Sequence, residues 1–254
     1  MKTKLTLIVS ALAMIVLLFS STVTASTLFL ANENSKASDN SQAMSLSQDI
    51  ERIDFIHYKK PKTLDAGTSG SVSKAAACYK LLGGKWGTLP VNYVINPANP
   101  QNLSVSFVTS AVSRAAETWD ASASKELFNN AFTIDYNEKY LNMNGKNAIV
   151  FGDYGSNNVI AVTSVWITRT GKNIVEFDIL FNTRYIWGDA STSSSVMDLQ
   201  EIAAHELGHG VGLADIYSTS CSTVTMYGYS GYGETIKRTL ESPDITGLQQ
   251  MYGR

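Results

Sequence analysis

Two histidines four residues apart are the side chains of this sequence best suited to chemistry. His205 and His209 flank Glu206 in the run His-Glu-Leu-Gly-His. On a helix, residues i and i+4 project from one face, so both imidazoles can reach a single zinc ion. Glu206 would lie beside the metal, where its carboxylate can take a proton from a water that attacks a carbonyl carbon. The run therefore predicts a hydrolytic zinc site.

A catalytic zinc needs a third protein ligand and one open position. Gly212 can adopt the left-handed conformation that ends a helix, and the chain can then turn back and present Asp215. His57 is the one other histidine, and because it lies far upstream we do not expect it to be a ligand. We therefore predict that Asp215 joins the histidine pair in holding one zinc. The alternative is that Asp215 caps the turn, and that Tyr217 or a second water completes the coordination.

The elements that must position this site can be traced in the pattern from residue 77 onward. An apolar stripe at helical spacing predicts one helix and comprises Val108, Ala111, Val112, Ala115 and Trp119. Predicted strands cover residues 91–95, 131–136, 148–152, 159–168 and 174–181. Residues 195–198 resemble a capping box that would open the histidine helix, and residues 243–252 suit a terminal helix. The pattern predicts one α+β domain.

The run from His205 to Asp215 resembles the signature of the metzincin zinc peptidases, and the wider pattern resembles their matrixin (matrix metalloprotease) branch. Lys85-Trp86 is similar to the matrixin start, and residues 244–253 are similar to its closing helix. The resemblance implies a metzincin-like α+β catalytic domain. Such a domain has a twisted, mostly parallel sheet, an active-site helix, a methionine turn and a C-terminal helix. It also implies zinc-dependent hydrolysis of peptide bonds, with Glu206 as general base.

The same resemblance implies roles for residues outside the zinc run. Met226 would form the hydrophobic floor beneath the zinc, although methionine is also an ordinary core residue. Tyr227 would form the wall of the pocket for the first residue after the scissile bond. The strand over residues 159–168 would be an edge strand that pairs with an extended substrate.

The sequence also departs from the matrixin pattern. Asp215 stands where vertebrate matrixins have histidine, and resembles the snapalysin type of metzincin. The histidines of a structural zinc site are missing, so we predict a single zinc. Gly228 replaces the usual proline after the turn tyrosine, and no proline-framed cysteine switch surrounds Cys78. Calcium is a further candidate ion, to which the loop 152–155 or Asp178 could contribute.

Two cysteines, Cys78 and Cys221, allow one internal disulfide. An exported chain with this count favours pairing, because oxidising compartments preserve disulfides. The alternative is a latency switch in which the Cys78 thiolate occupies the open zinc position.

The N-terminus predicts export. Lys2 and Lys4 precede the apolar stretch 5–19, and residues 23–25 form a small-residue cleavage site. We therefore predict a signal peptide over residues 1–25; an uncleaved membrane anchor is the alternative. Residues 26–76 would be a prosegment or linker, partly disordered, and residues 77–254 the peptidase domain.

Charge and composition narrow the function further. A net charge of -2 and a pI near 5.9 carry no electrostatic footprint for nucleic acid. We predict a secreted, monomeric endopeptidase that acts on proteins or peptides, without stable insertion into a membrane. The alternative is a non-catalytic extracellular binding module with a structural zinc, in which Glu206 would have no task.

Overall fold

The computed structural model describes residues 49–61 and 77–254. The predicted signal peptide and most of the predicted prosegment lie outside these ranges. Within them, no helix has the length and apolar character needed to cross a membrane.

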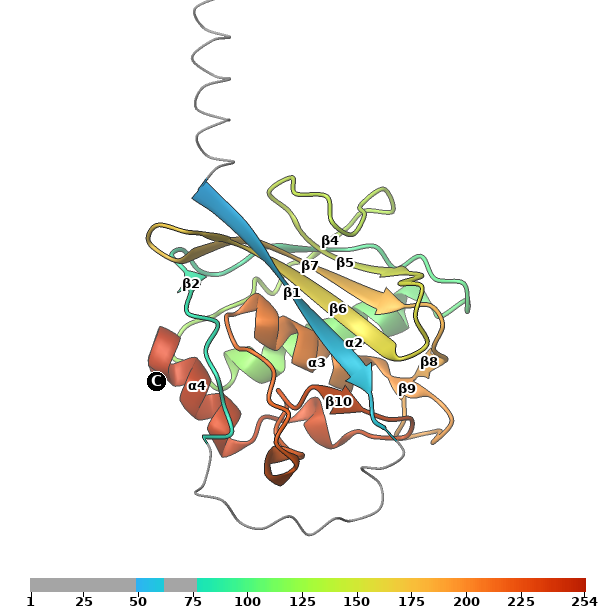
Figure 1. The fold of residues 1–254 in the computed structure, drawn as a ribbon. Helices are drawn as coiled ribbons and strands as arrows, with labels where there is room; N and C mark the ends of the chain where they lie inside the picture. Colours follow the sequence, from blue (N-terminus) through green and yellow to red (C-terminus); the bar gives the residue numbers. More distant parts are fainter. Residues whose placement is uncertain (1–48, 62–76) are drawn as a thin grey trace, which may run out of the picture. The chain divides into compact units, whose positions relative to one another are not determined.

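The main sheet has eight strands, in the order β10-β1-β6-β7-β5-β3-β4, with β2 paired to β7 (Figure 1). Its strands are β1 (Ile50–Lys59), β2 (Lys85–Trp86), β3 (Tyr93–Ile95), β4 (Thr133–Ile134), β5 (Asn147–Gly152), β6 (Val159–Thr168), β7 (Asn173–Asn182) and β10 (Tyr229–Ser230). The β1–β6 and β6–β7 pairings are antiparallel, and the other five are parallel. The prediction of a mostly parallel sheet in an α+β domain is confirmed.

Strand β6 spans Val159–Thr168, as the sequence predicts. All of its side chains but the last are buried: Thr163 contacts Glu206 of α3 on one face, and Ser164 contacts Tyr140 on the other. A strand buried on both faces needs a near-continuous apolar run rather than strict alternation. The sequence Val-Ile-Ala-Val-Thr-Ser-Val-Trp-Ile supplies that run.

Among the residues that the structure describes, three α-helices accompany the sheet: α2 (Val105–Asp120), α3 (Leu199–Gly210) and α4 (Ser242–Tyr252). Two short 3-10 helices are η2 (Thr219–Cys221) and η3 (Ile236–Arg238), and a small second sheet pairs β8 (Trp187–Gly188) with β9 (Met197–Asp198). The apolar stripe predicted for α2 is buried. Trp119 of that stripe donates a hydrogen bond of 2.8 Å from its indole nitrogen to the Ala204 carbonyl of α3, which fixes the two helices against each other.

Helix α3 begins later than predicted. Asp198, not Ser195, is its N-cap, and the Asp198 side chain accepts a hydrogen bond of 2.8 Å from the Glu201 amide. The capping box predicted over residues 195–198 is therefore wrong. The reason is tertiary: Met197 pairs with Trp187 in the small sheet, which holds this segment extended, and Arg238 binds the Asp198 carboxylate.

Strand β1 was not expected in the domain. Residues 50–59 fall within the segment assigned to a prosegment or linker, yet they form an inner strand of the main sheet, between β6 and β10. Strand β1 therefore belongs to the same compact unit as the strands of residues 77–254. The expectation that β6 is an edge strand is wrong for the same reason, since β1 pairs along the whole of its outer side (Figure 1).

Candidate metal centre

Helix α3 presents the two histidines on one face, as their spacing predicts. Both side chains are fully buried, and their Nε2 atoms lie 3.1 Å apart. The Nδ1 atom of His205 lies 2.7 Å from the Thr225 carbonyl oxygen, and that of His209 lies 2.9 Å from the Leu213 carbonyl oxygen. A carbonyl only accepts hydrogen bonds, so each Nδ1 carries the proton and each Nε2 keeps a free lone pair. Histidines that bind metals are oriented in this way.

The turn after α3 brings Asp215 to the same point. Gly212 has a φ of +105°, and an added Cβ there would lie 2.5 Å from the Gly84 carbonyl oxygen, so both conformation and space require glycine. Leu213 donates from its amide to the Gly208 carbonyl at 2.9 Å, which closes the turn. Asp215 Oδ1 then lies 3.2 Å from His205 Nε2 and 3.5 Å from His209 Nε2.

These three side chains fit a divalent cation. Asp215 Oδ1 is buried without a hydrogen-bond partner, and it faces two imidazole lone pairs. Burial by itself would raise the pKa of Asp215, but the two imidazoles outweigh burial and hold that pKa well below its usual range. Burial would likewise lower the pKa of His205, but Asp215 and Glu206 outweigh it and raise that pKa. The cluster therefore attracts positive charge, and two nitrogens with one carboxylate oxygen are a donor set that suits zinc.

Glu206 lies beside this donor set and is fully buried. Its Oε2 accepts a hydrogen bond of 2.5 Å from the Thr163 hydroxyl on β6, whereas its Oε1 has no hydrogen-bond partner. Burial would raise the pKa of Glu206, but the neighbouring imidazoles, His57 first among them, outweigh burial and lower it. Glu206 thus presents one free, ionised oxygen toward the centre, which is what a general base requires.

His57 is also at the centre, and the expectation that it lies far from the site is wrong. The β1–β6 pairing sets His57 opposite Ala161, two residues before the threonine that holds Glu206. Its Nδ1 lies 3.3 Å from Glu206 Oε1, and its Nε2 shares a hydrogen bond of 3.0 Å with the Ser230 hydroxyl. Its pKa falls to about 4, chiefly because burial disfavours the charged form. The scarcity of histidine in the sequence was the one signal that could have drawn attention to it.

Met226 packs directly behind the histidine helix. It is fully buried, and a Cβ added at Gly208 would lie 2.3 Å from its Sδ. Gly208 therefore lets the methionine approach the backbone of α3 between the two histidines. Tyr227, the residue expected to form a pocket wall, is 2% exposed and packs with Cys221 and Val224.

Asp244 supports the methionine turn, a role that the sequence analysis missed. Its carboxylate accepts hydrogen bonds from the amides of Thr225 at 2.9 Å and Met226 at 3.2 Å. The Thr225 carbonyl accepts in turn from His205, so α4 orients a histidine through this turn. Asp244 also takes part in a capping box with Glu241 at the start of α4, and that local pattern was visible in the sequence.

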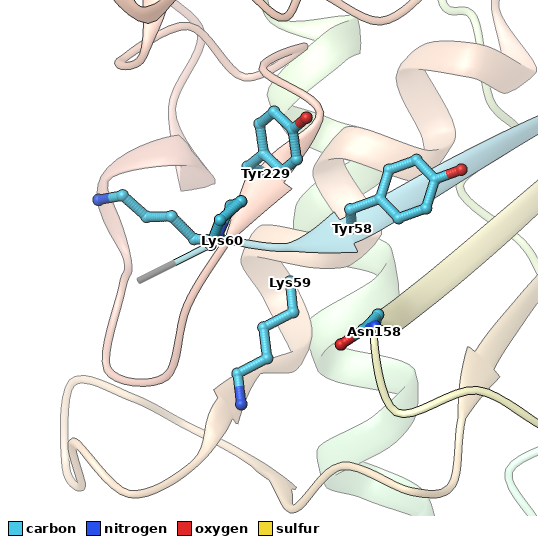
Figure 2. Close-up of a pocket in the computed structure, with 6 residues that line it drawn as sticks. Tyr58, Lys59, Lys60, Asn158 and Tyr229 are labelled. Atoms are coloured by element: carbon cyan, nitrogen blue, oxygen red, sulfur yellow. The ribbon is translucent and has the colours of Figure 1, made fainter. Parts of the chain in front are cut away.

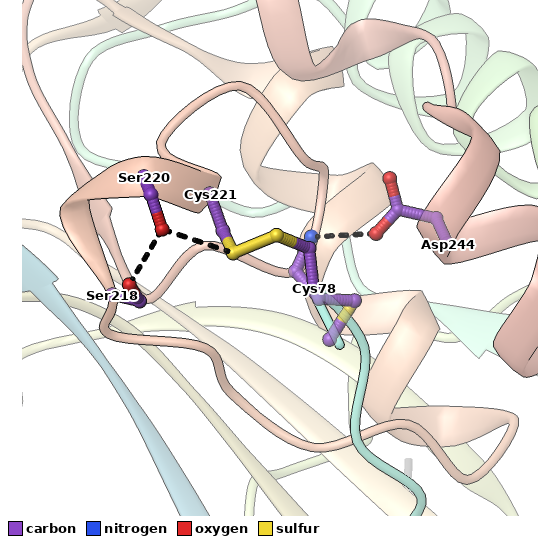
Figure 3. Close-up of a disulfide and its surroundings, with 6 residues drawn as sticks. Cys78, Ser218, Ser220, Cys221 and Asp244 are labelled. Atoms are coloured by element: carbon purple, nitrogen blue, oxygen red, sulfur yellow. Dashed lines mark hydrogen bonds between the residues drawn. A yellow bond between two sulfur atoms is a disulfide. The ribbon is translucent and has the colours of Figure 1, made fainter. Parts of the chain in front are cut away.

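Cys78 and Cys221 are joined by a disulfide, with their Cα atoms 5.5 Å apart (Figure 3). Neither thiol is free, so the alternative in which a Cys78 thiolate binds the zinc is wrong for this state. The bond ties the start of the 77–254 segment to the loop between Asp215 and Met226.

Gly228, which stands where matrixins usually have proline, leaves room for the side chain of Tyr217. A Cβ at Gly228 would lie 2.4 Å from Tyr217 Cε1 and 3.0 Å from Asp215 Oδ1. Burial and the negative charge of Asp215 raise the pKa of Tyr217. Tyr217 thus stays a neutral phenol beside the carboxylate.

The two calcium candidates make other contacts. Asp153 binds Arg184 through Oδ1 at 2.5 Å, and Asp178 accepts from the amides of Ala148 at 3.1 Å and Asn142 at 3.2 Å. Within residues 49–61 and 77–254, groups of at least three potential metal ligands occur only around α3. They are His205 with His209 and Asp215, and His205 with His57 and Glu206.

A surface cavity of about 470 Å³ lies beside the site, at the end of β1 (Figure 2). Its lining comprises Tyr58, Lys59, Lys60, Pro61, Asn158 and Tyr229. None of these residues is a predicted ligand or base.

Comparison with known proteins gives a consistent result. A family profile described as Matrixin matches residues 85–253. Matrix metalloproteinase-25 of Mus musculus is 33% identical over 85 residues, which make up 33% of this chain and 14% of that protein. Matrix metalloproteinase-25 of Homo sapiens is 32% identical over 85 residues, 33% of this chain and 15% of that protein. The matching stretch therefore spans only a small part of the length of these relatives.

Proposed function

The chain belongs to the matrixin family, and on that premise we propose that it is a secreted zinc-dependent endopeptidase. The observation that carries the proposal is the convergence of three buried acceptors, His205 Nε2, His209 Nε2 and Asp215 Oδ1. Such a cluster needs a positive charge at its centre, and a divalent cation bound by all three atoms supplies it. We propose one zinc ion, held by these three side chains.

When bound, zinc supplies a Lewis acid that lowers the pKa of a water molecule and polarises a carbonyl. The protein supplies the proton transfers. Glu206 Oε1 accepts a proton from the attacking water and then delivers it to the nitrogen of the leaving amine. Thr163 keeps the carboxylate in position through Oε2. Met226 and the Thr225 carbonyl keep α3 and His205 in place.

The disulfide supports action outside the cytoplasm, where such bonds persist. Together with the signal-like N-terminus, it favours secretion. The substrate class is protein or peptide, because the main chain of any extended polypeptide can form hydrogen bonds with a strand of the sheet, whatever its side chains.

The test is replacement of Glu206 by Gln, with Glu117→Gln on the exposed face of α2 as the matched control. Zinc content is measured by elemental analysis, and hydrolysis is measured on a denatured protein mixture with and without a chelator. Loss of a general base costs about 100-fold or more in rate, so Glu206→Gln should keep its zinc and lose that much activity. The control should match the wild type. Equal activity in Glu206→Gln, or no bound zinc in the wild type, would contradict the proposal.

A further inference from the structure

Lys237 is a buried cation that the proposed hydrolysis does not use. It lies in η3, after the methionine turn, and its side chain is 2% exposed. Its Nζ lies 3.0 Å from Glu201 Oε1 and 2.8 Å from Glu234 Oε2. Burial would lower the pKa of Lys237, but the two carboxylates outweigh burial and raise it, so the side chain is an ammonium. Apolar residues of similar volume often serve stability as well as a buried ion pair does, so this lysine calls for another explanation.

Glu201, the more deeply buried of its two partners, belongs to helix α3. It lies four residues before His205, and residues at this spacing share one face of a helix. Its Oε2 accepts a hydrogen bond of 3.1 Å from the Lys237 amide, and its Oε1 accepts one of 3.4 Å from the Ser230 hydroxyl. Both the side chain and the main chain of Lys237 therefore hold α3, one turn before a proposed zinc ligand.

The main chain of Lys237 also reaches the methionine turn. Thr225 is fully buried, and its hydroxyl oxygen lies 3.4 Å from the Lys237 carbonyl oxygen and 3.1 Å from the Thr239 carbonyl oxygen. Carbonyls only accept hydrogen bonds, so the hydroxyl donates. The Thr225 carbonyl in turn accepts the hydrogen bond of 2.7 Å from His205 Nδ1. Thr225 therefore joins η3 to a proposed zinc ligand through two of its own polar groups.

These contacts form a closed ring. Its members, in order, are His205, Thr225, Lys237 and Glu201, and one turn of α3 closes it. Because the helix is a rigid side of the ring, the ion pair fixes where the Thr225 carbonyl stands relative to the imidazole. His209 lies outside the ring, since its Nδ1 donates to a carbonyl of the turn after α3.

We propose that Lys237 is a positioning residue of the metal centre: its ion pair with Glu201 holds the Thr225 carbonyl against His205 and thereby raises the affinity of the centre for zinc. The inference rests on the proposed function, because it concerns the same zinc site. Partners that orient a metal-binding histidine contribute about 10- to 100-fold to metal affinity. Lys237 acts through one further residue, so we expect an effect of about 10-fold.

The first experiment removes both charges of the pair from the full chain. The charge-free variant is Glu201→Gln/Lys237→Met, whose new side chains have similar sizes and leave no unpaired charge at either position. Glu234 keeps a partner, because its side chain is 27% exposed and lies 3.7 Å from the Lys60 ammonium. Competition with a chromogenic chelator should show zinc binding about 10-fold weaker than in the wild type.

The matched control makes the same exchange in an exposed ion pair. Glu51 and Lys172 are also 3.0 Å apart, but their side chains are 35% and 52% exposed. Exposed pairs contribute little, so Glu51→Gln/Lys172→Met should bind zinc within about twofold of the wild type. Wild-type zinc affinity in the charge-free variant would overturn the inference.

The second measurement needs no zinc. In the zinc-free chain, NMR follows how fast the Nδ1 protons of His205 and His209 exchange with water. A fixed Thr225 carbonyl protects the His205 proton, so this proton should exchange about 10-fold faster in the charge-free variant. The His209 proton, outside the ring, should exchange as in the wild type. A variant that was only less stable would expose both protons alike.

Thr225 supplies an independent test that decides the matter if the charge-free variant does not fold. Thr225→Val keeps the branched shape and removes the hydroxyl, whereas Thr225→Ser keeps the hydroxyl. The valine variant should bind zinc about 10-fold more weakly, and the serine variant should stay within about threefold of the wild type. Added to the charge-free variant, Thr225→Val should change the affinity little, because the ring is already open.

The results distinguish this inference from the proposed function. A wild type that binds no zinc would end the proposed function, and proton exchange would then decide on the ring by itself. Equal zinc binding by Thr225→Val and Thr225→Ser would overturn the inference. A His205 proton that exchanges no faster in the charge-free variant would overturn it as well. Equal acceleration of both protons would have the same consequence, since Lys237 would then serve only general stability.

Discussion

Replacing Gly208 by Ala tests whether the space between α3 and the methionine turn is as tight as the structure shows. In an ordinary helix interior this change stabilises by about 1 kcal/mol. Here the new Cβ would lie 2.3 Å from Met226 Sδ and 2.6 Å from Trp119 Cζ2, whereas ordinary contacts begin at 3.4 Å. The indole is anchored by its hydrogen bond to Ala204, so Met226 has to move by about 1 Å in a packed core.

Overpacking of this kind costs about 1–3 kcal/mol, offset by at most about 1 kcal/mol of helix propensity. We therefore expect Gly208→Ala to lower the free energy of unfolding by about 1–2 kcal/mol. The displacement also pushes on Thr225, whose carbonyl orients His205, so zinc affinity should fall as well. Urea unfolding in the presence of a chelator measures the first effect, and competition with a chromogenic chelator measures the second.

A double-mutant cycle makes the reasoning refutable. Met226→Ala by itself should cost about 2–5 kcal/mol through the cavity that it leaves. Added to Gly208→Ala, it should cost about 1–2 kcal/mol less than the sum of the two single changes. The matched control is Gly210→Ala on the same helix, where the nearest atom, Phe177 Cδ1, would lie at 3.1 Å and a shift of a few tenths of an ångström suffices. A Gly208→Ala protein as stable as the wild type would refute the tight contact.

Four further predictions follow from the same structure. Asp215→Ala should lower zinc affinity about 100-fold in chelator competition, with Asp215→His retaining part of it; unchanged affinity would instead favour Tyr217 or a water as third ligand. Asp244→Asn puts an amide donor against the turn amides and should lower the free energy of unfolding by about 1–3 kcal/mol, an effect that unaltered urea midpoints would exclude. Changing both Cys78 and Cys221 to Ala, which opens a link across 143 residues, should cost about 4–5 kcal/mol in the chain-entropy model; a loss below about 1 kcal/mol would contradict that account. Burial raises the pKa of Asp178 to about 7, so the folded chain binds a proton that the unfolded chain releases. The free energy of unfolding should therefore rise as pH falls from about 7 toward 4, and this rise should shrink in Asp178→Asn, with both proteins measured in chelator.

The sequence predicted the elements that depend on near neighbours. The apolar residues of α2, which end at Trp119, repeat at the spacing of a helix, and those of β6 form a continuous run. The structure buries both sets. The i, i+4 spacing of His205 and His209 places them on one face whatever the rest of the chain does. Gly212 and the turn after it follow from a conformational preference of one residue. Hence most of the proposed zinc site could be predicted from the eleven residues between His205 and Asp215, both included.

Predictions failed where the outcome depends on distant partners. The capping pattern at Ser195 was locally adequate, but the pairing of Met197 with Trp187 and the hold of Arg238 on Asp198 moved the start of α3. The buried Asp198 carboxylate binds the Arg238 guanidinium and accepts from two amides, so it is a stronger N-cap than the exposed Ser195 hydroxyl. Nothing within residues 195–198 indicates that Arg238 binds Asp198.

His57 shows the limit most clearly. By itself the sequence determined the family and the α+β class, and it predicted the metal-binding role proposed for α3, because short-range spacing and composition carry these. Only the tertiary structure decided that β1 belongs to the main sheet and that its histidine faces Glu206. Main-chain pairing is almost blind to side-chain identity, so any apolar extended segment could have taken the open side of β6. Which segment does so is set by the packing of Phe55 and His57 on α3, and that packing exists only when the chain is folded.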